Sequence, residues 1–338
     1  MDGHPAHDRH QVGRVKAALV LLASAIALLA GAPAVSLAQA YPSKPIRLIV
    51  PWPAGGIADV RARIMAEHLA KGLGQPVVID NRPGASGSVG AGMVARAKPD
   101  GHTLMYGSIQ DQVLAPLMLD SITYDPDRDF THITQFTRTP ILLVVTSALG
   151  VRTVAELVAL AKSRPGQLTY GSPGIAHTNH LAAEQFRIST GIEAAHVAFK
   201  GEAPMLADLL GGQVQFGFAY VGTSFPLVKA GRLNALMVTG SRRAPQLPSV
   251  PNAAEAGLPD LDIFSWGGLM APAGLQPEVL RRLHAEMVKV LRSRELAQRP
   301  EFVDSEIVAS SPEEFRALVI SDRKRWKNII DATAVKPQ

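Results

Sequence analysis

Two adjacent glycines, Gly55 and Gly56, lie between an apolar stretch at Ile46–Val50 and an amphipathic stretch at Asp59–Lys71. The first stretch has the composition of a β-strand and the second the periodicity of a helix. The first N–H groups of a helix have no partner within it and bear partial positive charge, so they bind anions. Glycine has no Cβ and lets a ligand approach the backbone. The loop therefore indicates either an anion site or a tight turn without a ligand.

The second half of the chain repeats this arrangement. The segment Tyr170-Gly-Ser-Pro-Gly174 follows the apolar end of a strand and precedes a helix that we expect to start near His177. One such loop in each half could hold a carboxylate from both sides. Each charge-assisted N–H···carboxylate bond contributes about 1.5–3 kcal/mol, and a few of them are compatible with micromolar binding.

Enzymatic and metal-dependent chemistry finds little support in the sequence. His177 and His180 share a helix face and could bind a metal, but no H-E-x-x-H motif is present, and one helix-start and one packed histidine is the alternative interpretation. The G-x-S-x-G nucleophile motif and the phosphate-binding G-x-x-x-x-G-K-[ST] loop are also absent. Asp59 could act as a general base, or its charge could simply suit the first turn of a helix. We expect no cofactor, no metal and no catalytic residue.

The composition points to an exported protein that does not bind nucleic acid. A basic start precedes an uncharged run at residues 17–30, which is followed by Ala38-Gln39-Ala40. This order is typical of a secretory signal peptide cleaved after Ala40, and the run is too short for a span of about 20 residues. An uncleaved membrane anchor is the alternative. The chain has no Cys and a net charge of +5. Its basic cluster at Arg323–Arg325 looks like a solvated helix end rather than a basic face.

Strands and helices alternate through residues 41–338, which predicts α/β structure with mostly parallel sheets. Two apolar strands, Ile141–Thr146 and Ile263–Met270, bracket the middle of the chain. If both connect two α/β lobes, the chain forms a two-lobed clamshell with a cleft. The predicted organisation is a signal peptide over residues 1–40, lobe 1 over residues 41–140 plus 262–338, and lobe 2 over residues 141–261.

The chain resembles the Bug family, the extracytoplasmic solute receptors of tripartite tricarboxylate transporters. The resemblance starts at Tyr41-Pro-Ser-Lys-Pro-Ile-Arg-Leu-Ile-Val-Pro-Trp-Pro-Ala-Gly-Gly56 and ends at Pro312-Glu-Glu-Phe315. Between them it includes Leu73–Gly84, Lys98–Leu104, Tyr124–Phe130, Tyr170–Ser172, His196–Gly201, Leu209–Val214, Ala253–Pro259 and Ser265–Trp266. The matches keep the order of the family and cover nearly all of the chain after residue 40.

The resemblance implies the two-lobed, type II-like periplasmic-binding (Venus flytrap) fold, with two mostly parallel sheets joined by two hinge strands. It also implies that a small carboxylate binds in the cleft between the lobes, largely through backbone groups and bridging waters. On the matching positions, the expected ligand-binding residues are Trp52, Ala54, Gly55, Gly56, Ala58, Asp59, Ser108, Ser172, His177, Lys200, Gly201, Ala219 and Tyr220. Some positions depart from the family pattern. The family often has a hydroxyl residue where this chain has Ala58, and often has Asp-Asn where it has Ala219-Tyr220. His177 stands where a small polar residue is usual in the family. We therefore expect a ligand without an ammonium group, with an apolar body against Tyr220 or Trp52. The alternative is that Ala219 simply packs in the core.

The function that follows is a monomeric periplasmic receptor, not an enzyme, which delivers a small organic acid to the large and small membrane subunits of a transporter. Two alternatives remain. The receptor could serve a signalling sensor instead of a transporter, or the chain could be a periplasmic hydrolase, which would need a nucleophile, a histidine and an acid at suitable spacing.

Overall fold

A computed structural model describes residues 41–332 of the 338-residue chain. The predicted signal peptide and its cleavage site after Ala40 lie outside the described residues. The strands are β1 (Ile46–Val50), β2 (Val77–Asn81), β3 (Thr103–Ser108), β4 (Phe130–Thr146), β5 (Leu168–Ser172), β6 (Ala194–Ala198), β7 (Phe216–Tyr220), β8 (Leu233–Val238), β9 (Phe264–Pro272) and β10 (Glu306–Ile307). The α-helices are α2 (Ile57–Leu73), α3 (Ser88–Ala95), α4 (Ala115–Met118), α5 (Val154–Ser163), α6 (Thr178–Thr190), α7 (Glu202–Leu210), α8 (Val221–Lys229), α9 (Pro277–Leu291), α10 (Arg294–Ala297) and α11 (Pro312–Ala332).

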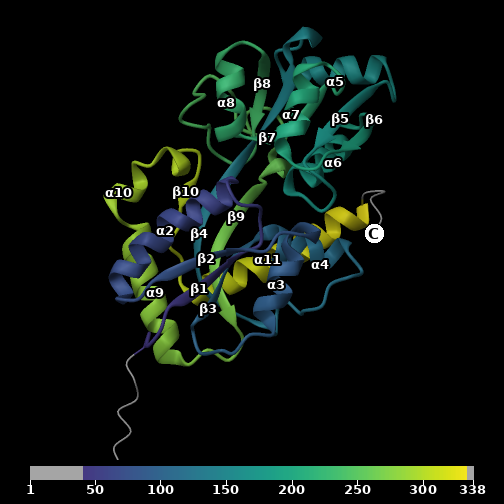
Figure 1. The fold of residues 1–338 in the computed structure, drawn as a ribbon. Coiled ribbons are helices and arrows are strands. Elements are labelled where there is room, and N and C mark those ends of the chain that lie inside the picture. The colour runs from purple at the N-terminus through teal and green to yellow at the C-terminus, as the bar shows by residue number, and fades with distance from the viewer. Residues whose placement is uncertain (1–40, 333–338) are drawn as a thin grey trace, which may run out of the picture. The chain divides into compact units, whose positions relative to one another are not determined.

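The strands form two sheets that share β4 (Figure 1). Residues 130–140 of β4 pair antiparallel with β9, and residues 141–146 pair with β7 and β8. The pairing changes between Pro140 and Ile141. We call the sheet of β1, β2, β3, β9, β10 and the first part of β4 lobe 1, and the sheet of β5 to β8 and the last part of β4 lobe 2.

Within each lobe the outer strands are parallel, as expected for β-α alternation. In lobe 1, β1 lies between β2 and β3 and is parallel to both. In lobe 2, β5 lies between β6 and β7 and is parallel to both. The predicted α/β class is therefore confirmed, but both sheets are mixed rather than mostly parallel, because β4 pairs antiparallel with β7, β8, β9 and β10, and β3 pairs antiparallel with β9. The two connecting strands differ, however, because β4 runs through both sheets whereas β9 pairs only within lobe 1.

Helices cover these sheets and bury the apolar faces. In lobe 1, α2 and α9 contact each other and share a buried cluster that includes Met65, Leu69 and Leu283. Helix α5 in lobe 2 starts as predicted, because the Thr153 side chain accepts from the Glu156 N–H while Glu156 accepts from the Thr153 N–H. No helix within residues 41–332 has both the length and the apolar character needed to cross a bilayer.

Several elements differ from the sequence-based expectation. Strand β4 begins at Phe130, eleven residues before the predicted strand start at Ile141. Strand β7 is followed directly by helix α8, which contains Pro226 and which the sequence analysis did not predict. The single helix expected over Pro277–Leu296 ends at Leu291, and a short second helix follows after Ser293.

His132 on β4 is a polar side chain sealed into the core of lobe 1. Its ring stands edge-on to Phe315, with centroids 5.3 Å apart, and neither ring nitrogen has a hydrogen-bond partner. Burial, reinforced by nearby Arg316, lowers the pKa of His132 to about 4. In the unfolded chain the His132 imidazole binds a proton near pH 6.5, but in the folded protein it does so only near pH 4. The stability contributed by neutral His132 is therefore lost as the pH falls from about 6.5 to 4.

The variant His132→Phe should reduce this acid sensitivity. When the pH falls from 7 to 5, the variant should lose less stability than the wild type. The two losses in the free energy of unfolding should differ by about 2 kcal/mol, because each pKa unit corresponds to about 1.4 kcal/mol. Urea denaturation at the two pH values measures the difference. Parallel stability profiles for the two proteins would contradict the account of His132.

Candidate functional site

A cavity of about 490 Å³ lies between the two lobes. Lobe 1 supplies the start of α2, the end of β3, the middle of β4, the start of β9 and the segment before β10, and lobe 2 supplies the starts of α6 and α8. The residues that line it are Trp52, Pro53, Gly56, Ile57, Ala58, Arg61, Tyr106, Ser108, Gln110, Thr137, Thr139, His177, Tyr220, Gly222, Thr223, Ser265, Trp266, Gly267, Pro300, Glu301 and Asp304. Aromatic rings and small hydroxyl side chains dominate this lining.

The structure brings six of the thirteen predicted ligand-binding residues into the lining. These are Trp52, Gly56, Ala58, Ser108, His177 and Tyr220. Gly56 is the N-cap of α2 and supplies no capping side chain, so the first N–H groups of the helix are available for an anion. Whether each of the six touches a ligand stays a prediction.

The backbone conformation of Gly56 does not require a glycine. Gly56 has φ −75° and ψ 165°, which any residue can adopt. Its neighbour Gly55 has φ +80°, the left-handed region that favours glycine. A side chain at Gly56 would therefore act only by crowding the cavity. An added Cβ would meet no atom closer than the Pro53 carbonyl oxygen, at 3.4 Å.

Three predicted residues of the first loop lie outside the lining. Ala54 and Gly55 are exposed at the tip of the loop. Asp59 is buried and accepts hydrogen bonds from the Gly55 N–H, from Arg63 and from Asn81. Burial alone would raise the pKa of Asp59, but these three bonds outweigh it and hold the pKa below its ordinary value. Asp59 is thus an ionised group that fixes the loop, and neither a general base nor a wall of the cavity.

Three predicted residues of lobe 2 are also outside the lining. Ser172 is fully buried, and its hydroxyl pairs with His196 Nε2 at 2.6 Å. The segment that contains Lys200 and Gly201 folds over this strand end, because the Phe199 N–H donates to the Ser172 carbonyl and the Gly201 N–H to the Pro173 carbonyl. The Lys200 side chain is exposed. In place of this loop, the start of α8 faces the cavity from lobe 2.

Ala219 is also placed differently from the expectation. It pairs with Leu142 of β4, and its methyl group is fully buried in the apolar cluster of lobe 2 with Leu142, Val144 and Val221. Alternate residues of a strand point to opposite faces of the sheet. The side chain at position 219 therefore packs in the core and does not face a ligand, so it gives no information about an ammonium group.

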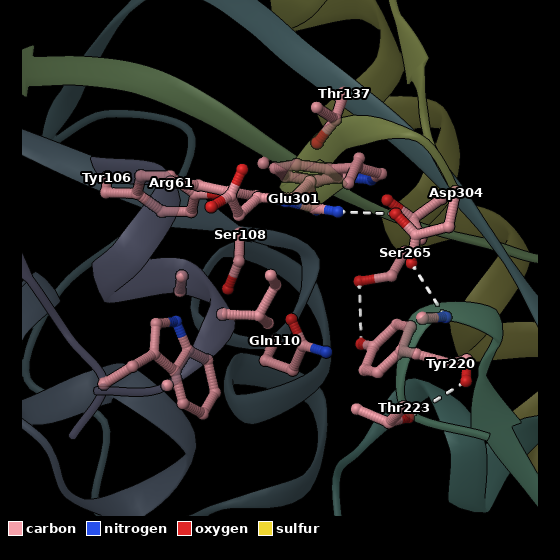
Figure 2. A pocket seen from close by; sticks show the side chains of 18 of the residues that line it. Arg61, Tyr106, Ser108, Gln110, Thr137, Tyr220, Thr223, Ser265, Glu301 and Asp304 are labelled. Carbon is pink, nitrogen blue, oxygen red and sulfur yellow. Dashed lines mark hydrogen bonds and ion pairs between the residues drawn. The ribbon is translucent and has the colours of Figure 1, made fainter. Parts of the chain in front are cut away.

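The sequence did not single out the charged residues of the cavity. Arg61 lies one turn after Ala58 on α2, and Asp304 lies 243 residues later in the chain, just before β10. Figure 2 shows Arg61 and Asp304 facing each other across the upper part of the pocket. The spacing of Ala58 and Arg61, three residues apart in a helix, was the one sequence signal that could have placed Arg61 beside the predicted site.

Arg61 and Asp304 form a nearly buried ion pair that also joins the lobes. Arg61 Nη2 donates to Asp304 Oδ1 at 2.7 Å and to Ser305 Oγ, and Arg61 Nε donates to the Glu301 carbonyl. The other oxygen of Asp304 accepts from the Gly222 N–H in the first turn of α8, at 3.1 Å. Asp304 thus connects lobe 1 with the helix start of lobe 2, and its charge is balanced by Arg61.

Hydroxyl groups form the part of the lining opposite α2. Tyr220 Oη donates to Ser265 Oγ at 3.1 Å, which links the end of β7 to the start of β9 (Figure 2). Behind Tyr220, Glu202 accepts from the Tyr220 N–H and from Thr223 Oγ1. Burial, opposed by these hydrogen bonds, raises the pKa of Glu202 to about 7. The start of α8 is therefore already contacted by two protein carboxyl groups, whereas the start of α2 is open to the cavity.

The two histidines that could have bound a metal on sequence grounds do not form a metal site. His177 Nδ1 pairs with Asn179, while His180 stacks on His196 with ring centroids 4.0 Å apart. Within the described residues, no group of three or more histidine, aspartate or glutamate side chains is arranged to hold an ion.

The Arg61–Asp304 pair yields a test of its energetic role. In Asp304→Asn the guanidinium of Arg61 loses its counter-charge, so the free energy of unfolding should fall by about 3 kcal/mol. The double variant Arg61→Met/Asp304→Asn should be less destabilised than Asp304→Asn alone, because no charge is left unpaired. Asp331→Asn, which breaks the exposed pair with Lys327, is the control and should have little effect. Chemical denaturation measures the wild type, these three variants and Arg61→Met, and additive effects of the two cavity substitutions would contradict the coupling.

Comparisons with known proteins agree with this geometry. The sequence model of the family described as "Tripartite tricarboxylate transporter family receptor" matches residues 61–335. Protein BugT of Bordetella pertussis is 32% identical over 300 residues, which cover 88% of this chain and 92% of BugT. An R. palustris protein solved with adipate is 35% identical with a TM-score of 0.81, over 88% of this chain and all of that one.

A second solved structure, MatC from Rhodopseudomonas palustris with bound malate, is 29% identical with a TM-score of 0.76, over 86% of this chain and all of that one. These similarities extend over both lobes and over the strands that connect them. The chain belongs to the family of tripartite tricarboxylate transporter receptors.

Proposed function

We propose that this protein is a periplasmic receptor that captures a small carboxylate in the cavity between its lobes and delivers it to the large and small membrane subunits of a tripartite transporter. The observation that supports this most directly is the open start of α2. Gly56, Ile57 and Ala58 line the cavity there, and the unpaired N–H groups of a helix start attract an anion.

The size and chemistry of the cavity suit a small organic acid. A volume of about 490 Å³ lies within the range of pockets for small molecules. Ser108, Gln110 and Thr137 add hydrogen-bonding groups, and Trp52 and Trp266 offer apolar surface for a carbon chain or ring. A carboxylate bound at α2 with its body against the indoles would use both kinds of surface.

Two relatives support the ligand class. The R. palustris structure contains adipate and the MatC structure contains malate, and both compounds are dicarboxylates of small size. We infer that this chain also binds a carboxylate, with a body chosen by its own lining residues.

The lobes would close on the ligand as two bodies. We propose residues 41–140 plus 262–338 for the first and 141–261 for the second, since the pairing of β4 changes after Pro140. Gln110 Nε2 donates to Thr178 Oγ1 across the cavity, as the Gly222 N–H does to Asp304. We further propose that the protein is a monomer that is exported by its first 40 residues and begins at Tyr41 after cleavage.

Catalysis is not part of this proposal. Ser172 and His196 are close enough to resemble a nucleophile and its base, but Ser172 is fully buried and lies outside the lining of the cavity. Its hydroxyl is also engaged by Gly174. A substrate in the cavity could not reach this pair. Delivery to a signalling sensor remains the second candidate, because the same cavity would serve either membrane partner.

A thermal-shift comparison of acids with their neutral amides tests the ligand class. Succinate, glutarate or adipate should raise the melting temperature, because a ligand that binds only the folded state stabilises it. The matching diamides lack the charge that the start of α2 attracts and should not. Stabilisation by the amides, or by sugars alone, would overturn the proposed function.

A substitution at Gly56 tests the location. Gly56→Val narrows the cavity beside the first N–H groups of α2 and should weaken binding of the best acid at least tenfold, about 1.4 kcal/mol. Gly211→Val is the matched control, since Gly211 also has an ordinary φ of −78° but lies outside the cavity. Equal affinity in both variants, measured by calorimetry, would move the site away from α2.

A further inference from the structure

His177 occupies a position in the cavity that decides which chemical groups a ligand can present there. It is the N-cap of α6, it lines the cavity, and its ring stands edge-on to that of Tyr220 with centroids 6.3 Å apart. The Tyr220 hydroxyl in turn pairs with Ser265 on the other side of the cavity. The imidazole is thus a fixed part of the wall contributed by lobe 2.

A chain of hydrogen bonds determines which nitrogen of His177 bears the hydrogen. Asn179 Nδ2 donates to the Phe218 carbonyl at 2.8 Å, and because a carbonyl can only accept, the amide nitrogen must point toward it. Asn179 Oδ1 therefore faces His177 Nδ1, 3.0 Å away. An amide oxygen can only accept as well, so Nδ1 of His177 is the donor.

The other nitrogen is then an acceptor. A neutral imidazole has one N–H, so Nε2 of His177 presents a lone pair. Burial lowers the pKa of His177 to about 4, although the bond to Asn179 opposes the shift, so the ring is neutral at pH 7. Nε2 has no hydrogen-bond partner among residues 41–331, and it is not sealed from solvent as both nitrogens of His132 are. This lone pair is therefore open to the cavity.

This acceptor lies in the same cavity as the open helix start at Gly56, which suits an anion. A carboxylate oxygen also has only lone pairs and cannot pair directly with Nε2, whereas a hydroxyl group can donate to it. Among the other polar groups of the lining, the Gln110 amide and the Thr137 hydroxyl can donate to a carboxylate, whereas Ser108 already donates to Asp111. We propose that His177 is a specificity-determining residue and that the ligand is a hydroxycarboxylate, whose hydroxyl group donates to His177 Nε2. This inference rests on the proposed function and narrows its ligand class.

Calorimetric titration with matched pairs of acids tests the proposal. The pairs are succinate with malate, glutarate with 2-hydroxyglutarate, and benzoate with 4-hydroxybenzoate, each differing by one hydroxyl group. For a skeleton that fits, the hydroxylated acid should bind about tenfold more tightly, as one satisfied hydrogen bond allows. Binding of acids without any preference for the hydroxyl group would overturn this inference alone, and no binding by any acid would overturn the proposed function.

The variant His177→Phe identifies the residue responsible. It keeps an aromatic ring against Tyr220 but removes the lone pair, so the tenfold preference for the hydroxylated acid should fall to about one. His284→Phe makes the same change at a half-buried histidine on α9, outside the cavity, and should keep the preference. A preference that survives in His177→Phe would overturn the assignment.

A spectroscopic measurement on the wild type does not depend on how the variant folds. Long-range ¹H–¹⁵N correlation spectra distinguish a protonated from an unprotonated imidazole nitrogen. His177 should show a hydrogen on Nδ1 and a bare Nε2, and the Nε2 signal should shift when the hydroxylated acid binds. A hydrogen on Nε2 in the wild type would overturn the proposal.

Discussion

The antiparallel pairing of β4 with β9 is the interaction on which the rest of the structure depends. β4 has 17 residues and belongs to both sheets, so the position of one lobe relative to the other is set by a single continuous strand. The cavity lies beside this strand, and Thr137 and Thr139 of β4 with Ser265 and Gly267 of β9 line it. Because β4 itself runs through both lobes, no loop is needed to bring the lobes together around the cavity.

Glycines make this pairing compatible with close packing on both faces. A Cβ at Gly267 would lie 2.9 Å from the Tyr106 hydroxyl, and one at Gly268 would lie 2.2 Å from the ring of Phe315. The first contact places the aromatic ring of Tyr106 in the wall of the cavity, and the second lets α11 pack against the sheet. The wall is therefore shaped by the backbone of β9 as much as by side chains.

The wall of the cavity contains three charged side chains, those of Arg61, Glu301 and Asp304. Asp304 could repel an acid, but Arg61 balances it at 2.7 Å. Asp304 also contacts the Gly222 N–H, so the helix start in lobe 2 is satisfied by the protein itself, and the open helix start at Gly56 remains for the ligand. Neutral His177 adds an acceptor to this set of donors, which makes the polar pattern of the wall selective rather than uniformly attractive to anions.

The sequence predicted the fold well, because the signals for it are local. The Thr153–Glu156 capping box and the glycine-bearing loop before α2 each lie within a few residues. The predictions failed where distant residues meet. No spacing rule connects Arg61 with Asp304, and the hydroxyl side chains of β4 were missed because the apolar pattern is clear only from Ile141 on. Helix α8 was not predicted, and its Pro226 is unfavourable in a helix interior, at a cost of about 3 kcal/mol. Ala219 was assigned to the site from resemblance, although strand pairing turns it into the core.

The measurement that tests the central claim most directly is mass spectrometry of the protein after gentle purification from its natural periplasm. First the intact complex is weighed under native conditions, and then the small molecules are identified after release by denaturation. The account predicts one small carboxylic acid per protein chain in the wild type, at much lower occupancy in Gly56→Val. A wild-type protein that releases a neutral sugar or a cation in place of an acid, or that keeps the acid unchanged in Gly56→Val, would contradict it.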